Sequence, residues 1–230
     1  RDLVRSRGLG DVYKRQGYTF AGWYTAASGG SKISTTTTMP AGGATYYAHW
    51  TKNNYYLDLN TYLDGASYGG SRIKVNLTVG GSNKGYVSDY YTAHPYGTSW
   101  SINGLQIDGV TLSYTASGTV GASTTYIPMN FYTLTIARNN TSYGTTSASS
   151  VIVKDGTSYW TSGATLTLGD GRTVTASPTA ATGYSTSFSS WSPSKAMISG
   201  GARTVTANFS RTGNTYYVAS VSYTHLRAHE

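Results

Sequence analysis

The chain has 230 residues, only 11% of them charged, and it is rich in glycine, tyrosine, serine and threonine, a composition that predicts an all-β, mainly antiparallel fold. Cysteine is absent, which excludes disulfides, thiolate metal sites and cysteine nucleophiles, and no apolar run reaches the roughly 20 residues of a membrane span. The net charge is +8, but the basic residues between positions 17 and 220 stand singly, so we expect neither a nucleic-acid partner nor direct membrane insertion.

Both ends of the chain differ in composition from the sequence between them. One choice of codons for residues 6–16 (SRGLGDVYKRQ) has a reverse complement that, in another reading frame, encodes residues 221–230 (VSYTHLRAHE). This DNA resembles a transposase-type sequencing adapter. We therefore predict that residues 1–16 and 221–230 are adapter-derived and not native, and that they flank a metagenomic fragment.

Residues 17–51 begin with the motif Gly-Tyr-x-Phe-x-Gly-Trp-Tyr and close with Tyr-Ala-x-Trp. The motif positions are Gly17, Tyr18, Phe20, Gly22, Trp23, Tyr24, Tyr47, Ala48 and Trp50. This pattern resembles the C-terminal half of the internalin-type B repeat, also called the Listeria–Bacteroides repeat. The resemblance implies a truncated β-grasp-like unit, in which Phe20 and Trp23 are core anchors and not ligand contacts.

Residues 52–131 form the next predicted module, which starts with the alternating strand YYLDLN. Glycine pairs such as Asp-Gly and Asn-Gly predict tight turns between its strands. Near its middle, DYYTAHPYGTSW places Tyr90, Tyr91, Tyr96 and Trp100 around a Pro-Tyr-Gly turn. These four residues are the candidate ligand contacts, because exposed aromatic rings can stack on sugars or anchor a partner. The alternative is that alternate members point inward and form the core.

Residues 132–211 form a further module that resembles a divergent form of the same repeat. GYSTSFSSWS keeps the Phe-x-x-Trp spacing with Phe188 and Trp191, and TVTANFS supplies a closing aromatic residue, Phe209. No glycine directly precedes Trp191, which departs from the first repeat. Residues 212–220 are predicted to start another module.

The closing aromatic residues of the three segments follow a regular phase. Trp50, Phe131 and Phe209 are separated by 81 and 78 positions, and an alternating strand follows each of them. This period of about 80 residues predicts tandem small β modules.

The search for catalytic and metal-binding patterns finds none that is complete. Most carboxylates between residues 17 and 220 stand next to glycine, where turn formation is the expected role. His49 and His94 lack the spacing of zinc ligands, residues 58–65 lack the alternating oxygen ligands of a calcium loop, and residues 80–85 lack the end of a phosphate loop. We predict no catalytic residue, no metal site and no cofactor.

The sequence therefore favours a non-catalytic tandem-repeat region of an extracellular protein, on the surface of a Gram-positive bacterium or secreted by it. Its expected role is that of a stalk, spacer or adhesive module, with host or bacterial surface glycans or proteins as partners. The alternative is a carbohydrate-binding module or an accessory region of a cell-wall or polysaccharide-active enzyme. The sequence leaves the oligomeric state open.

Overall fold

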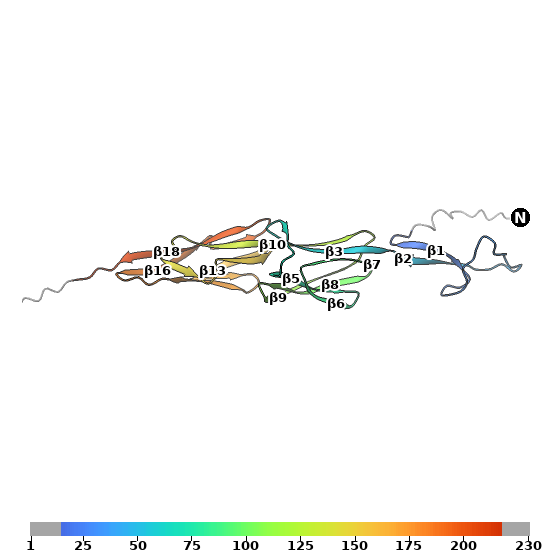
Figure 1. The fold of residues 1–230 in the computed structure, drawn as a ribbon, viewed down its shortest axis with the longest axis horizontal. Helices are drawn as coiled ribbons and strands as arrows, with labels where there is room; N and C mark the ends of the chain where they lie inside the picture. Colours follow the sequence, from blue (N-terminus) through green and yellow to red (C-terminus); the bar gives the residue numbers. More distant parts are fainter. Residues whose placement is uncertain (1–14, 218–230) are drawn as a thin grey trace, which may run out of the picture. The chain divides into compact units, whose positions relative to one another are not determined.

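The computed structural model describes residues 15–217, and it consists of strands joined by turns and loops (Figure 1). No helix occurs within that range, so the prediction of an all-β fold is confirmed. Residues 1–14 and 218–230 lie outside the described residues, and with them lies nearly all of the two segments that we predicted to be adapter-derived. Arg15 and Gln16 are described, and both are exposed.

The chain divides into two compact units. Unit 1 comprises the chain up to Tyr132 together with Ile152–Asp155, and unit 2 comprises Thr133–Val151 and the chain from Gly156 onward. The predicted module boundary lies between residues 131 and 132, one position before this division.

Unit 1 contains a hairpin and two facing sheets. The hairpin pairs β1 (Tyr18–Tyr24) with β2 (Tyr47–Lys52). The strands of the first sheet are β3 (Asn54–Leu63), β4 (Ala66–Ser67), β7 (Asp89–Pro95) and the first half of β10 (Thr125–Arg138). The strands of the second sheet are β5 (Ile73–Val79), β6 (Ser82–Val87), β8 (Ser99–Ile107) and β9 (Val110–Thr119), in the order β6-β5-β8-β9.

Unit 2 is built in the same way from two sheets. The strands of its first sheet are the second half of β10, β16 (Tyr184–Ser192) and β18 (Arg203–Gly213). The strands of its second sheet are β11 (Gly144–Thr146), β13 (Thr157–Ser162), β14 (Thr165–Leu168), β15 (Thr173–Pro178) and β17 (Lys195–Ile198). Strand β12 (Ser150–Lys154) pairs with β10, and from Ile152 onward it belongs to unit 1, where Ile152 is part of the core.

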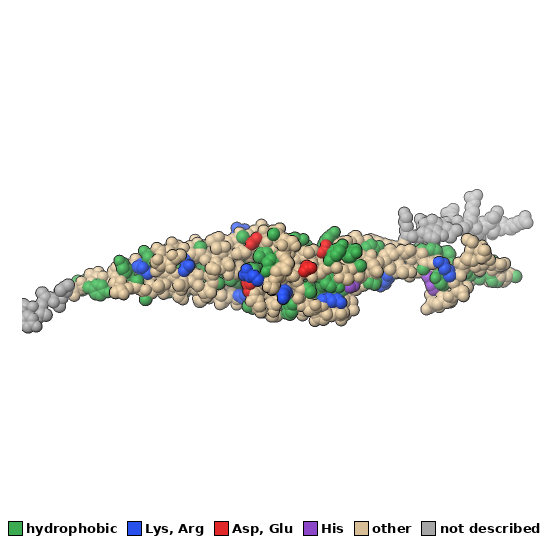
Figure 2. All heavy atoms as spheres, viewed as in Figure 1, with side chains coloured by type: hydrophobic (Ala, Val, Ile, Leu, Met, Phe, Trp, Pro, Cys, Tyr) green, Lys and Arg blue, Asp and Glu red, His purple; other side chains and the backbone are tan. Residues whose placement is uncertain are grey.

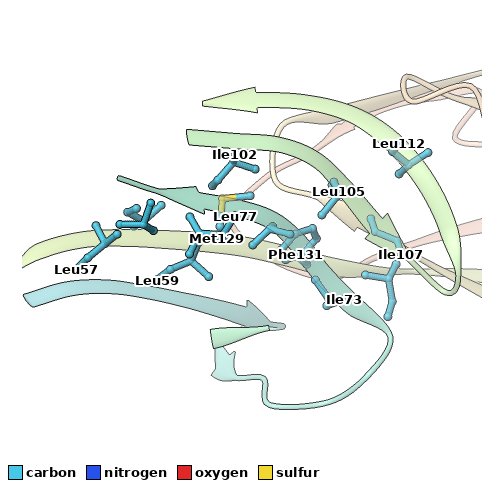
Figure 3. Packing of buried hydrophobic residues seen from close by; sticks show 14 of the residues in the cluster. Leu57, Leu59, Ile73, Leu77, Ile102, Leu105, Ile107, Leu112, Met129 and Phe131 are labelled. Atoms are coloured by element: carbon cyan, nitrogen blue, oxygen red, sulfur yellow. The ribbon is translucent and has the colours of Figure 1, made fainter. Parts of the chain in front are cut away.

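The core of unit 1 lies between its two sheets, where alternate residues of each strand point inward. Figure 3 shows leucine and isoleucine side chains of both sheets meeting around Phe131 and Met129. Phe131 is fully buried, and Leu57 and Leu59 of β3 pack in the same cluster. The alternation that predicted half-buried strands in the sequence is therefore the alternation that fills this core.

Strand β10 serves both units. Its residues 125–131 pair in parallel with β3, and its residues 134–138 pair in parallel with β18. The buried positions are Ile127, Met129 and Phe131 in the first half but Leu134 and Ile136 in the second, so they change from odd to even numbers. The chain thus passes from one core to the next within a single strand.

The aromatic motif residues form matching clusters in two hairpins. In β1 and β2, Phe20 lies opposite Trp50, Trp23 lies opposite Ala48, and the register shifts by a bulge after Phe20. In β16 and β18 the corresponding pairs are Phe188 with Phe209 and Trp191 with Ala207, again with a bulge after the phenylalanine.

The rings in these hairpins also contact one another in the same manner. The ring centroids of Phe20 lie 5.7 Å from Trp23 and 5.3 Å from Trp50, and Phe188 lies 5.8 Å from both Trp191 and Phe209. The divergent segment therefore repeats the register and the aromatic packing of the first repeat. The two clusters differ in burial, since Trp191 and Phe209 are nearly inaccessible whereas Phe20, Trp23 and Trp50 are only partly buried.

Glycine is required at two places in this packing. At Gly17 the backbone has a φ of +80°, and a Cβ atom would lie 2.3 Å from the Tyr96 ring. At Gly144 a Cβ atom would lie 2.2 Å from the ring of Phe209, so β11 approaches this ring only because it carries no side chain there.

We predict that Phe131→Ala lowers the free energy of unfolding of unit 1 by about 3–5 kcal/mol, because it leaves a cavity in a closed core. Tyr126→Ala on the same strand, where the side chain is 70% exposed, should change it by no more than about 0.5 kcal/mol. Chemical denaturation of the full chain measures both. Equal losses for the two variants would contradict the assignment of the inward face of β10.

Candidate recognition surface

The four candidate aromatic residues lie on two strands and the turn between them, but they do not share one exposed surface. Tyr90 and Tyr91 belong to β7, Trp100 belongs to β8, and Tyr96 lies in the turn that joins these strands. Tyr90 and Trp100 pack against the core of unit 1. Tyr91 is 61% exposed on the other face of β7.

Tyr96 has a structural environment. Its ring lies edge-on to Tyr18, with centroids 5.6 Å apart, and to Tyr55, with centroids 6.5 Å apart. Its backbone N–H donates to the carbonyl of Asn53. Tyr96 therefore packs where the hairpin of β1 and β2 meets the start of β3.

Trp100 lies near the start of β8, opposite Gly118 of β9. A Cβ atom at Gly118 would lie 2.7 Å from the indole, so glycine makes room for the ring. The indole Nε1 is buried and has no hydrogen-bond partner among residues 15–217. Beside the ring runs an open groove of about 520 Å³, lined mainly by the hydroxyl side chains of Thr78, Ser99, Ser101, Ser117 and Thr119.

A different set of tyrosines is exposed on the outer face of the first sheet of unit 1. Tyr56 of β3, Tyr91 of β7 and Tyr126 of β10 are 44%, 61% and 70% exposed. The rings of Tyr56 and Tyr91 are stacked, with centroids 4.4 Å apart and planes within 6°. Asp58 lies opposite Tyr91 on one side and opposite Tyr126 on the other, so Tyr91, Asp58 and Tyr126 form a row across β7, β3 and β10.

Polar side chains lie between these rings. The side-chain amide of Asn60 donates to Asp58 Oδ1, and Asp89 lies opposite Asn60 on β7 and accepts a hydrogen bond from Ser88. We call this surface the tyrosine face. It consists of Tyr56, Asp58, Asn60, Asp89, Tyr91 and Tyr126.

The charge of the tyrosine face is opposite to that of the whole chain. Asp58 and Asp89 supply two carboxylates, whereas the outward positions of β3, β7 and residues 125–131 of β10 include no lysine or arginine. Figure 2 shows acidic side chains among hydrophobic ones over the region where β3 runs. Aromatic rings with carboxylate and amide groups between them suit a ligand that has both apolar faces and hydroxyl groups.

The sequence pointed to one of the three tyrosines of this surface and missed the other two. Tyr91 is a predicted contact residue, whereas Tyr56 lies in the predicted alternating strand YYLDLN and Tyr126 has no predicted role in recognition. The alternation of their strands indicates that both side chains point outward, since Tyr56 and Tyr126 occupy positions that alternate with buried leucine and isoleucine. Their proximity to Tyr91 depends on the register of β7 and β10 against β3, which no local pattern carries.

His94 of β7 is partly buried beside Tyr90. The Tyr90 hydroxyl lies 2.9 Å from His94 Nε2, and the two rings are stacked with centroids 5.9 Å apart. Burial, together with the positive charge of Lys84, lowers the pKa of His94 below its ordinary value. A neutral imidazole is able to accept the hydrogen bond from the Tyr90 hydroxyl.

The carboxylates that stand before glycine have the turn geometry expected of them at two positions. Asp64 and Asp108 both have a φ of +51° and precede Gly65 and Gly109, which also have positive φ. This is the backbone of a type I′ turn. Asp108 also pairs with Arg72, and their hydrogen bond raises the pKa of the arginine.

Residues 15–217 contain no group of three or more histidine, cysteine, aspartate or glutamate side chains placed to hold a metal ion. Nor does this range contain a helix that is long and apolar enough to cross a membrane.

Fold and surface thus define an all-β chain of small tandem modules, and comparison with known proteins identifies its first part. Residues 9–49 match the Listeria-Bacteroides repeat domain family. A segment of 41 residues is 54% identical to internalin H of Listeria monocytogenes serovar 1/2a, and it covers 17% of this chain but only 8% of internalin H. The first part of the chain therefore carries a Listeria–Bacteroides repeat of the internalin type, as its motif residues predicted.

The matched segment begins before the motif that predicted it. It starts at residue 9, eight positions before Gly17. Within it, the Arg15 guanidinium lies over the Tyr18 ring, 4.1 Å from its centroid. The adapter origin of residues 1–16 and 221–230, and the β-grasp-like form of the first repeat, stay predictions.

We predict that the stability of unit 1 falls as the pH is lowered from 7 to 5. Because the pKa of His94 is depressed in the folded state, the unfolded chain takes up the proton first, near its ordinary pKa of about 6.5. The stabilisation is complete above that value and is lost as the pH falls toward the folded pKa. His94→Gln removes this titration, so thermal unfolding between pH 5 and 7 should depend less on pH. An unchanged dependence would contradict the role of His94.

Proposed function

We propose that this chain is a non-catalytic, load-bearing spacer region of a bacterial surface or secreted protein. The observation that carries the proposal is the pairing of the first strand of each sandwich with its last strand. In unit 1 these are β3 and β10, in unit 2 they are β10 and β18, and both pairs are parallel.

Parallel pairing of these two strands decides how a pulling force acts on the module. A force along the chain enters a sandwich at the start of its first strand and leaves at the end of its last strand. In a parallel pair those two points lie at opposite ends, so the strands are pulled past each other. The hydrogen bonds between them, which are evenly spaced along a parallel pair, are then loaded together instead of one after another.

The side chain of Asn139 extends the pairing in unit 2 beyond the last strand pair. Its amide nitrogen donates to the carbonyl of Phe209, and the backbone N–H of Phe209 donates to its Oδ1, both at 2.9 Å. These two bonds imitate one more step of a strand ladder. They secure β18 at the closing aromatic residue.

Strand β10 passes load directly from one module to the next, because no loop lies between its two halves. The presence of an internalin-type repeat at residues 9–49 supports a place in a surface or secreted protein. Few charged residues and many serine and threonine side chains are compatible with a neutral, solvated spacer. Gram-positive origin and wall attachment belong to the same proposal.

The test is single-molecule unfolding of the full chain, stretched from its two ends. Residues 54–131 and residues 133–213 should release nearly the same length, about 3.3–3.6 Å of extended chain per residue, so the event of unit 2 is identified as the one whose force changes in variants of unit 2. Alternate backbone N–H groups of a strand point to opposite neighbours, and the N–H of Ile136 bonds to the carbonyl of Ser149. The N–H of Thr135 therefore points toward β18. Because proline has no N–H, Thr135→Pro should lower the force of this event.

The matched control lies outside the parallel pair. Leu166→Ala in β14, a fully buried position, should cost about 2–5 kcal/mol of stability, comparable to the roughly 3 kcal/mol or more expected of a misplaced proline. Leu166→Ala should therefore lower the unfolding force of unit 2 less than Thr135→Pro does. Equal forces for the two variants would show that the parallel pair bears no special load.

A further inference from the structure

We propose that the tyrosine face binds a linear glycan chain that carries no acidic groups. The inference does not depend on the spacer proposal, since it rests on the outer face of one sheet and not on the strand order of the modules.

The aromatic rings of the tyrosine face are exposed, and two of them are stacked in a fixed orientation. Tyr126 and Tyr91 expose more than half of their side-chain surface, although tyrosines elsewhere in unit 1, such as Tyr55 and Tyr90, pack against its core. The stacking of Tyr56 on Tyr91 holds two of the rings in place before any ligand arrives. Rings that are already fixed lose little conformational freedom on binding, which favours affinity.

Aromatic and acidic groups alternate along the row that crosses β7, β3 and β10. Tyr91, Asp58 and Tyr126 occupy facing positions on β7, β3 and β10, so the backbone positions of the two tyrosines are about 10 Å apart, which is two strand spacings. A chain of sugars repeats apolar C–H faces and hydroxyl groups along its length. Two sugar units are able to contact the two rings while the carboxylate between them accepts hydrogen bonds from hydroxyls.

The charged side chains of the tyrosine face are both acidic. Asp58 and Asp89 repel an acidic polymer at close range, and no basic side chain occupies an outward position of these three strands to offset them. The amide of Asn60, bonded to Asp58, also fixes the position of that carboxylate. The surface therefore discriminates against acidic glycans and admits neutral ones, or ones that bear amino groups.

The position of the exposed rings on the outer side of a sheet favours a glycan over a folded protein partner. A protein interface is usually anchored by a side chain that fills a pocket, whereas the tyrosine face is the outer side of a sheet with rings standing on it. A second copy of this chain is the remaining occupant, and the experiment separates the two.

The experiment is affinity electrophoresis of the full chain in gels that contain one soluble polysaccharide each. The probes are mixed-linkage β-glucan, arabinoxylan, galactomannan and glycol chitin, with polygalacturonate as the acidic counterpart. We expect retardation by at least one of the first four that Tyr91→Ala and Tyr126→Ala weaken, whereas any retardation by polygalacturonate follows from the net charge of +8 and is unchanged in these variants. Tyr91→Ala and Tyr126→Ala should each weaken the apparent Kd roughly tenfold, as expected for the loss of one stacking contact.

Two further variants keep the result interpretable. Tyr126→Phe retains the ring and should bind nearly as the unaltered chain does. Tyr86→Ala, in β6 of the opposite sheet, removes another partly exposed tyrosine (38%) and should not change binding. Thermal unfolding verifies that all four variants are folded, as the exposure of Tyr91 and Tyr126 leads us to expect.

The proposal is overturned if none of the four acid-free polysaccharides retards the chain, or if Tyr126→Ala binds as tightly as the unaltered chain. It is also overturned if sedimentation shows self-association that Tyr91→Ala and Tyr126→Ala abolish, because the tyrosine face would then serve a second copy of the chain. None of these results bears on the force at which unit 2 unfolds, so the spacer proposal fails or stands separately.

Discussion

The parallel pairing of the first and last strands of a module is the constraint on which the rest of this structure depends. It places β3 beside β10 and β10 beside β18, so each core closes between strands that are some 70 residues apart in the chain. The remaining antiparallel strands pair mostly with near neighbours and fill the space that this pairing leaves. One strand, β10, satisfies the requirement twice and thereby joins the two cores.

The same aromatic cluster occurs in two hairpins of the chain. Phe20, Trp23 and Trp50 in the first hairpin correspond to Phe188, Trp191 and Phe209 in the last, with the same register and a bulge at the same place. The bulge in the first hairpin involves Gly22 at a φ of +133°. Its counterpart near Trp191 has serine, so the packing of the rings, and not glycine at the bulge, is the shared feature.

The tyrosine face illustrates how a recognition surface arises from a strand whose inner face is committed to the core. Each strand has two faces, and the leucines and isoleucines of β3 and β10 use only one of them. The other face is free to carry Tyr56, Asp58 and Tyr126 without cost to the fold. Structure and recognition therefore use the same strands but different residues.

The sequence by itself determined the all-β class and the internalin-type repeat, because composition, alternation and motif spacing are local features. The module period of about 80 residues, taken from Trp50, Phe131 and Phe209, stays a prediction. The sequence also proposed Tyr91 as a contact residue. Only the tertiary structure separated Tyr91 from Tyr90, Tyr96 and Trp100 and joined it to Tyr56 and Tyr126. The physical reason is register. A shift of one residue between paired strands moves every outward side chain to the inner face of the sheet, and β3 pairs with β10 through residues too far apart in the sequence for any local pattern to predict.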